Sequence, residues 1–321
     1  MVRGRSPLPP GRQIVTLAGG VGAAKFIRGL VRRIAPQRLT VVVNTGDDET
    51  FYGLHVSPDL DTVTYTLANL VNREQGWGRV DETFTTLKEL AHFYGKPWFA
   101  LGDRDFATHL YRTERLRAGA RLSEVTNEIA RALGVKSQVL PMSDDRLRTF
   151  VKIRGRRALP FQQYFVRGRA RGAVERIELR GAQDARALPA AIHALRTAAG
   201  TILAPSNPFV SLGPILALAG VRHTLARSRR RVAAISPIVG GRTIKGPADK
   251  MLRGLGMAVS PVSIARLYRD IVGVFVLDQI DRRYADAIEK LAMRTVVTDT
   301  IMTTPARAAR LAEVVLRALE V

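Results

Sequence analysis

Residues 39–62 read LTVVVNTGDDETFYGLHVSPDLDT. The valines at 41–43 predict a buried strand, which Asn44-Thr45-Gly46 ends. Four carboxylates follow the strand: Asp47, Asp48, Asp59 and Asp61. Crowded carboxylates are costly unless a cation or polar partners offset them, and open α/β sheets bind ligands outside the carboxyl ends of their strands. The segment therefore predicts a site, one that holds a metal ion against phosphates.

The rest of the chain repeats the strand-then-helix pattern. Short apolar runs stand at 14–18, 201–204, 232–235, 274–277 and 295–298, with helical periodicity between and after them. Together with residues 39–43 they predict an α/β fold built on a mostly parallel sheet of about six strands.

The region between the second and third of these strands has a different pattern. Residues 81–135 show helical periodicity, and residues 150–180 alternate apolar and charged side chains, which predicts a small antiparallel piece. We therefore expect a core formed by residues 13–72 and 185–321, with an inserted helical and β subdomain at 73–184. Residues 1–12 are basic and Pro-rich without an apolar signal core, and predict a flexible lead-in.

The chain of 321 residues carries a formal net charge of +22, with 42 Arg and 8 Lys. A nucleic-acid-binding protein is one explanation of such a charge. The arginines are spread along the chain, however, and their clusters at 154–171 and 227–231 contain no interleaved aromatic stacking motif. We favour a solvated basic surface that attracts anionic substrates as a by-product, and predict no specific nucleic-acid partner.

Cysteine is absent, which excludes disulfides, thiol catalysis and thiolate metal sites. No apolar run reaches the roughly 20 residues that a membrane span needs. We expect a cytoplasmic protein without a membrane partner.

A glycine turn follows the first strand, with Gly19, Gly20, Val21 and Gly22 leading into a helix that carries Lys25 on its first turn. Such a turn lets backbone N–H groups approach a phosphate, aided by the helix dipole. It lacks the full dinucleotide fingerprint, so a purely structural turn stays an alternative.

Hard cations such as Mg²⁺ take one or two carboxylates together with substrate phosphates. We favour Asp47 or Asp48 with Asp61 as the ligands, because Asp59 follows Pro58 at a helix start and fits a capping role.

Two further motifs admit both a structural and a functional interpretation. Residues 101–105, LGDRD, lie between helices, where an Asp caps a helix or two Asp residues orient an Arg toward an anion. Residues 204–208, APSNP, close a strand with a rigid loop whose Asn offers the donor and acceptor that a purine edge requires. The five histidines show no metal-ligand spacing, and His109 fits helix packing.

Taken together, these motifs resemble the 2-phospho-L-lactate transferases of deazaflavin coenzyme F420 biosynthesis. The matching blocks run in order from residue 17 to residue 303: LAGGVGAAKFIRGL, VVVNTGDD, HVSPDLDTVTYTLA, GWGRVDETF, LGDRDFATHL, VLPMSDD, FQQYFVRGRARG, APSNPFVSLGPIL, ISPIVGG and TDTIMT.

The resemblance implies a Rossmann-like core, often a homodimer, and a Mg²⁺-dependent transfer. The donor would be the guanylyl diphosphate ester of a three-carbon acid, of the 2-phospholactate or phosphoenolpyruvate type. The acceptor would be the deazaflavin alcohol Fo, and GMP would leave. The sequence does not identify the acid.

The resemblance also implies roles for individual residues. Asp48 or Asp61 would accept the proton of the attacking hydroxyl. The residues expected to meet Fo are Asp61, Ala100, Leu101, Asp103 and Arg104. Those expected to face the phosphate and guanosine are Gly19, Gly20, Val21, Gly22, Lys25, Asn44, Ser206, Asn207, Pro208 and Ser211. A nucleotide-sugar-binding regulatory protein of the same superfamily fold is the main alternative, and a basic nucleic-acid-binding protein is a weaker one.

Overall fold

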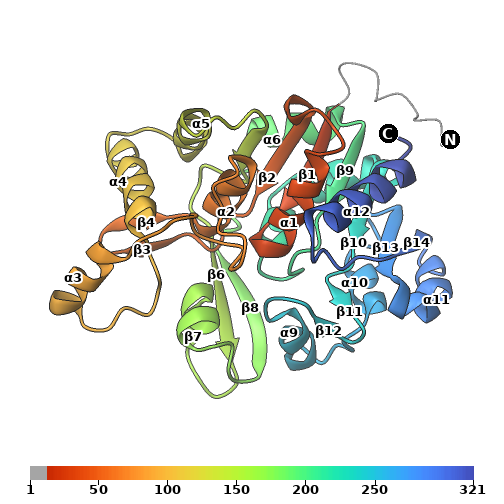
Figure 1. Ribbon diagram of the computed structural model, residues 1–321. Coiled ribbons are helices and arrows are strands. Elements are labelled where there is room, and N and C mark those ends of the chain that lie inside the picture. The colour runs from red at the N-terminus through yellow and green to blue at the C-terminus, as the bar shows by residue number, and fades with distance from the viewer. Residues whose placement is uncertain (1–12) are drawn as a thin grey trace.

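The computed structural model describes residues 13–321, and the predicted flexible segment 1–12 lies outside that range (Figure 1). Across the described residues, the largest sheet has seven parallel strands in the order β14-β13-β10-β9-β1-β2-β5. This is the doubly wound, Rossmann-like order with one strand added, so the predicted fold class is confirmed. The strands are β1 (Ile14–Ala18), β2 (Leu39–Val43), β5 (Gln138–Pro141), β9 (Gly200–Leu203), β10 (Val232–Ile235), β13 (Val274–Asp278) and β14 (Arg294–Thr298).

Six of these strands match the predicted ones, but β5 was not predicted. It lies inside the range 73–184 that we assigned to the insertion, and it pairs with β2 from Thr40↔Gln138 to Val43↔Pro141. Part of the predicted insertion is therefore an edge strand of the main sheet.

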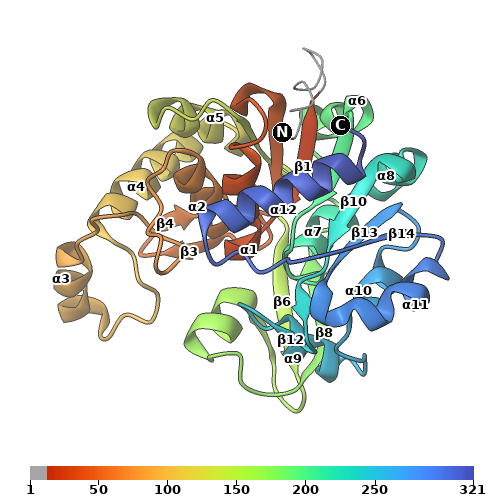
Figure 2. The ribbon, with the colours of Figure 1, turned by 45° about the vertical axis from the view of Figure 1, so that its right-hand side comes forward.

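Helices cover both faces of the sheet. On one face lie α1 (Gly20–Leu30), α2 (Pro58–Leu67) and α12 (Pro305–Ala318), and α12 crosses in front of the strands (Figure 2). Helices α1 and α12 pack closely, since a Cβ at Gly29 would collide with the backbone of Ala308.

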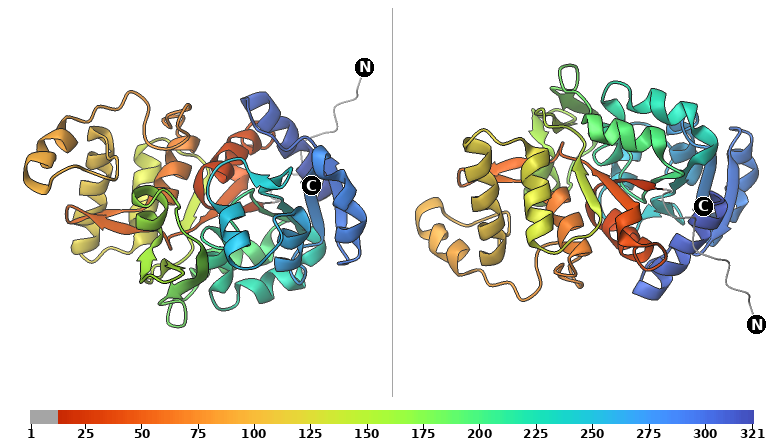
Figure 3. Two further views of the ribbon diagram at one scale, coloured as in Figure 1. Left: turned by 90° about the horizontal axis from the view of Figure 1, so that it is seen from below. Right: turned by 90° about the horizontal axis from the view of Figure 1, so that it is seen from above.

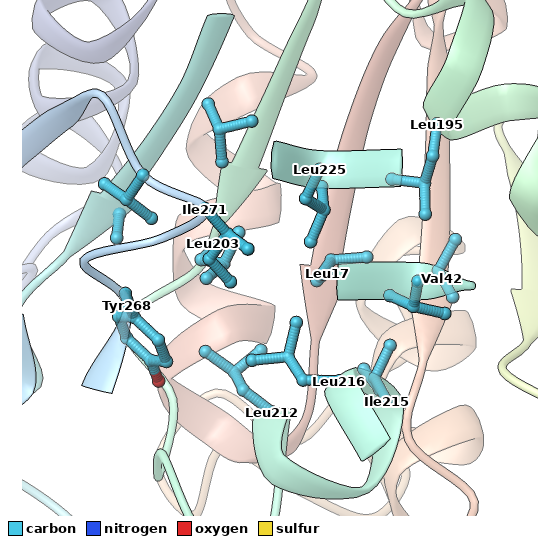
Figure 4. Packing of buried hydrophobic residues seen from close by; sticks show 14 of the residues in the cluster. Leu17, Val42, Leu195, Leu203, Leu212, Ile215, Leu216, Leu225, Tyr268 and Ile271 are labelled. Atoms are coloured by element: carbon cyan, nitrogen blue, oxygen red, sulfur yellow. The ribbon is translucent and has the colours of Figure 1, made fainter. Parts of the chain in front are cut away.

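The opposite face is covered by α6 (Pro189–Thr197), α7 (Leu212–Ala217), α8 (Val221–Arg227), α10 (Pro261–Leu267) and α11 (Ala285–Glu289). Figure 4 shows Leu17, Val42 and Leu203 of the sheet meeting Leu212 of α7 and Leu225 of α8. Successive strand residues point to opposite faces, so the sheet is apolar on both sides, as expected of a parallel sheet covered by helices.

The remaining elements extend away from the sheet. The hairpin β3 (Glu49–Phe51) and β4 (Leu54–Val56) joins α3 (Thr85–Tyr94), α4 (Asp103–Arg117) and α5 (Leu122–Ala132) at the end opposite β14 (Figure 3). The predicted antiparallel piece consists of β6 (Arg148–Ile153), β7 (Ala158–Pro160) and β8 (Val174–Arg180). A second hairpin, β11 (Ile238–Val239) and β12 (Arg242–Thr243), leads to α9 (Ala248–Gly254). None of the helices within residues 13–321 has the length and apolar character that crossing a membrane requires.

Candidate active site

A cavity of about 720 Å³ opens at the carboxyl ends of the main-sheet strands. Its lining includes residues from the loops that follow β1, β2, β9, β10 and β14. Strands β2 and β9 flank β1 on opposite sides, and the chain leaves β1 in one direction before returning to build the other half of the sheet. The cavity therefore lies at the topological switch point, where doubly wound sheets bind their ligands.

The walls of the cavity differ in chemistry. The loops and helices that follow the core strands supply the glycine turn, carboxylates, hydroxyls and Lys25. The insertion and the antiparallel piece supply aromatic rings: Trp77, Trp98, Phe99, Phe161 and Phe165. Phe161 and Phe165 are stacked with their centroids 5.4 Å apart. No sequence motif marks this aromatic wall, because its rings come from separate segments with no common spacing.

The glycine turn combines structural need with open space. A Cβ at Gly22 would collide with the carbonyl oxygen of Pro205, and one at Gly19 would lie 2.6 Å from Ser211 Cβ. These two glycines let the turn after β1 pack against the loop after β9. Gly20 differs, because its φ is +73° and no atom lies within 4 Å of a Cβ there. Close packing thus explains two of the three glycines, and Gly20 leaves room for a ligand.

Asp59 binds the start of α1. Its Oδ1 accepts a hydrogen bond of 2.7 Å from Gly20 N, and its Oδ2 accepts one of 2.9 Å from Asn44 Nδ2. The expectation that Asp59 caps the helix following Pro58 is wrong, because both residues lie within α2 and Asp59 holds a different helix. Asn44 also donates to Val210 O, and it is absent from the cavity lining. Asn44 and Asp59 therefore fix the relative positions of the loops after β1 and β2.

Asp47 and Asp48 each keep one oxygen without a partner. Asp48 Oδ2 lies 2.8 Å from Ser57 Oγ and 2.9 Å from His55 Nε2, whereas Asp48 Oδ1 and Asp47 Oδ1 are buried and form no hydrogen bond. Burial raises the pKa of both carboxyls, and the neighbouring Asp59 raises that of Asp47 further. Asp47 lines the cavity, whereas Asp48 is outside the lining. These unpartnered oxygens are the groups that a cation would satisfy.

Asp61 lines the cavity but is paired with a buried arginine. Both of its oxygens accept from Arg112 of α4, whose side chain is only 2% exposed. Arg112 Nη1 also lies 3.2 Å from His109 Nδ1. An arginine can only donate, so His109 Nδ1 accepts and its Nε2 carries the proton. Burial lowers the pKa of His109 to about 4, which keeps it neutral.

The LGDRD segment separates into structural and cavity residues. The carboxylate of Asp103 accepts hydrogen bonds from Thr85 N and Thr86 N at the start of α3. Asp103 itself begins α4, so it caps the neighbouring helix α3. Arg104 donates to Val80 O. Neither residue lines the cavity, whereas Ala100, Leu101 and Asp105 do.

Asp105 was not among the predicted site residues. It is 7% exposed, and burial, reinforced by the charges of Asp61 and Glu82, raises its pKa to about 7. A carboxyl poised near neutrality in a cleft is a candidate for proton transfer.

The loop after β9 is held by its own asparagine. Asn207 Oδ1 accepts from Phe209 N at 2.9 Å and from Val210 N at 3.3 Å, which is an Asx-type turn. Ser206, Asn207 and Ser211 line the cavity, whereas Pro208 does not. The Oγ of Ser206 is buried and has no hydrogen-bond partner. Ser206 is therefore freer than Asn207 to bind a ligand.

Comparison with solved structures relates the fold to protein BH3568 from Bacillus halodurans. One structure of it matches with a TM-score of 0.62 at 17% identity, over 95% of this chain and 99% of that one. At this identity the likeness concerns the fold.

The sequence comparisons are more specific. The chain is 41% identical over 314 residues to a phosphoenolpyruvate transferase of Kitasatospora aureofaciens, covering 96% of this chain and 98% of that protein. It is 35% identical over 305 residues to the 2-phospho-L-lactate transferase of Methanosarcina mazei, covering 95% and 100%. The family model described as 2-phospho-L-lactate transferase CofD matches residues 14–316. The chain therefore belongs to the 2-phospho-L-lactate transferase CofD family and is a transferase.

Proposed function

We propose that the protein transfers a phosphoenolpyruvate-type group from its guanylyl diphosphate ester to the deazaflavin alcohol Fo, releasing GMP, in coenzyme F420 biosynthesis. The observation that carries the proposal is one cavity whose core wall is polar and whose insertion wall is aromatic. The relative named phosphoenolpyruvate transferase has a higher identity than the one named 2-phospho-L-lactate transferase, which favours the enolpyruvyl donor.

The aromatic wall suits the acceptor. Trp77, Trp98 and Phe165 line the cavity, and Trp77 and Phe165 are 41% and 37% exposed. Large exposed rings around a cleft offer stacking and apolar contact to a planar ring system. The polar wall, with Gly20, Ser206 and Lys25, suits the guanosine and phosphates of the donor.

The carboxylates fit a magnesium ion that shares substrate phosphates. Within the described residues no three His, Cys, Asp or Glu side chains are grouped to hold a metal. The free Oδ1 of Asp47, which lines the cavity, would supply one of the one or two carboxylates that Mg²⁺ takes alongside phosphate oxygens, and Asp48, outside the lining, would act through a water molecule. A bound Mg²⁺ would neutralise charge on the diphosphate. Asp61 is a weaker ligand candidate, because Arg112 occupies both of its oxygens.

Asp105 is the best-placed acceptor for the hydroxyl proton. In the proposed step the terminal hydroxyl oxygen of Fo bonds to the phosphorus that carries the acid. The bond from that phosphorus to GMP breaks, GMP leaves with the electron pair, and the hydroxyl proton passes to an Asp105 oxygen. Asp61 is held by Arg112 and Asp48 is outside the lining, so both are less accessible than predicted.

The test is product analysis by mass spectrometry. The protein is incubated with Fo, Mg²⁺, GTP, a guanylyltransferase and either phosphoenolpyruvate or 2-phospholactate. The proposal expects an enolpyruvyl product, lighter than the lactyl product by one pair of hydrogens. If GTP is consumed and the guanylyl diphosphate ester forms with either acid, but Fo stays unmodified and no GMP is released, the transfer is refuted.

Asp47→Asn and Asp48→Asn are expected to lower kcat by about tenfold or more each, as the loss of about 1.4 kcal/mol of transition-state stabilisation implies. With donor present, Mg²⁺ should raise the melting temperature of the wild type, and each substitution should remove most of that rise. Asp286→Asn, an exposed change on α11, is the control and should alter neither. Normal Mg²⁺ response in both site variants would mean that the metal lies elsewhere.

We also propose that the protein is a homodimer. Exposed apolar side chains gather on α3 and α4, with Phe93 82%, Tyr94 67% and Leu110 56% exposed. Such surfaces are typical of association sites. Light scattering after size-exclusion chromatography distinguishes a dimer from a monomer.

A further inference from the structure

Two lysines from distant parts of the chain line the same cavity. Lys25 lies on α1, and Lys245 lies between β12 and α9. Only Lys25 belongs to a recognisable motif, because Lys245 stands in a glycine-rich loop without a distinctive pattern.

Neither lysine has a carboxylate within 4 Å among residues 13–321. Lys245 Nζ donates one hydrogen bond of 2.9 Å to the carbonyl oxygen of Gln75, which also lines the cavity. An ammonium group has three donors, so this bond orients Lys245 and leaves two donors free.

The two ammonium groups repel each other. Burial lowers the pKa of Lys25, and the positive charges of Lys245 and Arg28 lower it further. Like charges that line one cavity raise each other's energy, and an anion bound between them adds an attraction to each that outweighs their repulsion.

One backbone N–H group of the glycine turn is not free to bind such an anion. Gly20 N–H, at the start of α1, is already bound by Asp59. A lysine side chain on this wall would replace the donor that Asp59 occupies and would add a full positive charge.

We propose that Lys25 and Lys245 together form a two-sided site for the diphosphate of a nucleoside diphosphate. The bound diphosphate links the turn after β1 to the β12–α9 loop, and Gln75 positions Lys245 for it. This inference rests on the proposed function and names the residues that hold the donor.

The test is calorimetric titration with GDP and with guanosine, at low salt and without Mg²⁺. Lys245→Ala and Lys25→Ala should each weaken GDP binding about tenfold, the loss of one charge-assisted hydrogen bond. Both should leave guanosine binding unchanged. Lys245→Arg keeps the charge and should retain most of the GDP affinity.

Lys250→Ala is the matched control. Lys250 lies on α9, donates to Ala170 O and does not line the cavity. The Lys250→Ala variant should bind GDP as the wild type does. Because the paired lysines repel, ligand-free Lys245→Ala should melt at the wild-type temperature or above it.

Two outcomes would overturn the inference: wild-type GDP affinity in Lys245→Ala, or equal loss of GDP and guanosine binding. The titration uses no Fo, so its result is separate from the transfer assay. If GDP binding depends on both lysines but the transfer assay yields no Fo product, the proposed transfer is refuted and the diphosphate site is still supported.

Discussion

Asp105→Asn is expected to lower kcat about 100-fold or more, the contribution typical of a positioned general base. Asparagine keeps the size and polarity of the side chain but cannot take up a proton. Asp105 lines the cavity beside Gly78, whose Cβ would lie 3.9 Å from Asp105 Oδ2, so the change acts where the acceptor is expected to bind. Steady-state kinetics with saturating Fo and donor provide the measurement.

The pH dependence gives a second, independent readout for Asp105. A base must be ionised, so wild-type activity should fall as the pH drops below about 7, the pKa to which burial and the charges of Asp61 and Glu82 raise this carboxyl. The same raised pKa means that ionised Asp105 destabilises the fold as pH rises from about 4 to 7. Asp105→Asn should therefore lose activity and yet be more stable than wild type at pH 8.

Glu114→Gln is the control for Asp105, because Glu114 is an exposed carboxylate on the same helix. It should change neither activity nor stability. Full activity in Asp105→Asn, or an unchanged acid limb of the pH profile, would exclude Asp105 as the proton acceptor.

Arg112→Ala is expected to lower the free energy of unfolding by about 3–5 kcal/mol, the usual cost of leaving one member of a buried ion pair alone. Arg112 joins three parts of the molecule: Asp61 on α2, the backbone of His55 in β4 and His109 on α4. Its loss leaves the Asp61 carboxylate buried without its counter-ion. Equilibrium unfolding in urea measures the change.

A paired variant separates loss of charge from loss of packing. Arg112→Met combined with Asp61→Asn removes both charges and keeps most of the side-chain volume, so it should recover much of the lost stability. An effect below about 1 kcal/mol in Arg112→Ala would contradict a buried pair and indicate a solvated one.

The fold could be predicted where local pattern and tertiary role agree. Residues 39–43 form a strand that is buried on both faces, and their sequence is uniformly apolar or β-branched. Strand β5 was missed because it has four residues, begins with the exposed Gln138 and ends with Pro141. A short run ending in proline is typical of a loop or an edge strand, and only its pairing with β2 distinguishes the two.

The site could be predicted as a region but not residue by residue. Three of the four carboxylates after β2, Asp47, Asp59 and Asp61, line the cavity, because strand ends meet at one edge of a parallel sheet. Their individual roles depend on partners far along the chain: Asp61 pairs with Arg112, 51 residues away, and Asp59 holds Gly20, 39 residues away. Asp105 and Lys245 lie in segments whose contribution to the cavity depends on tertiary packing.

The contact between α1 and α12 has a consequence for biosynthesis. Helix α12 is translated after every strand of the sheet, yet it covers α1, which follows the first of them. While the ribosome is still making the later strands, the part of α1 that packs against α12 is uncovered and is open to chaperones or to aggregation. The glycine turn is fixed to that helix, so its half of the cavity should become rigid only after residues 305–318 have left the exit tunnel and docked.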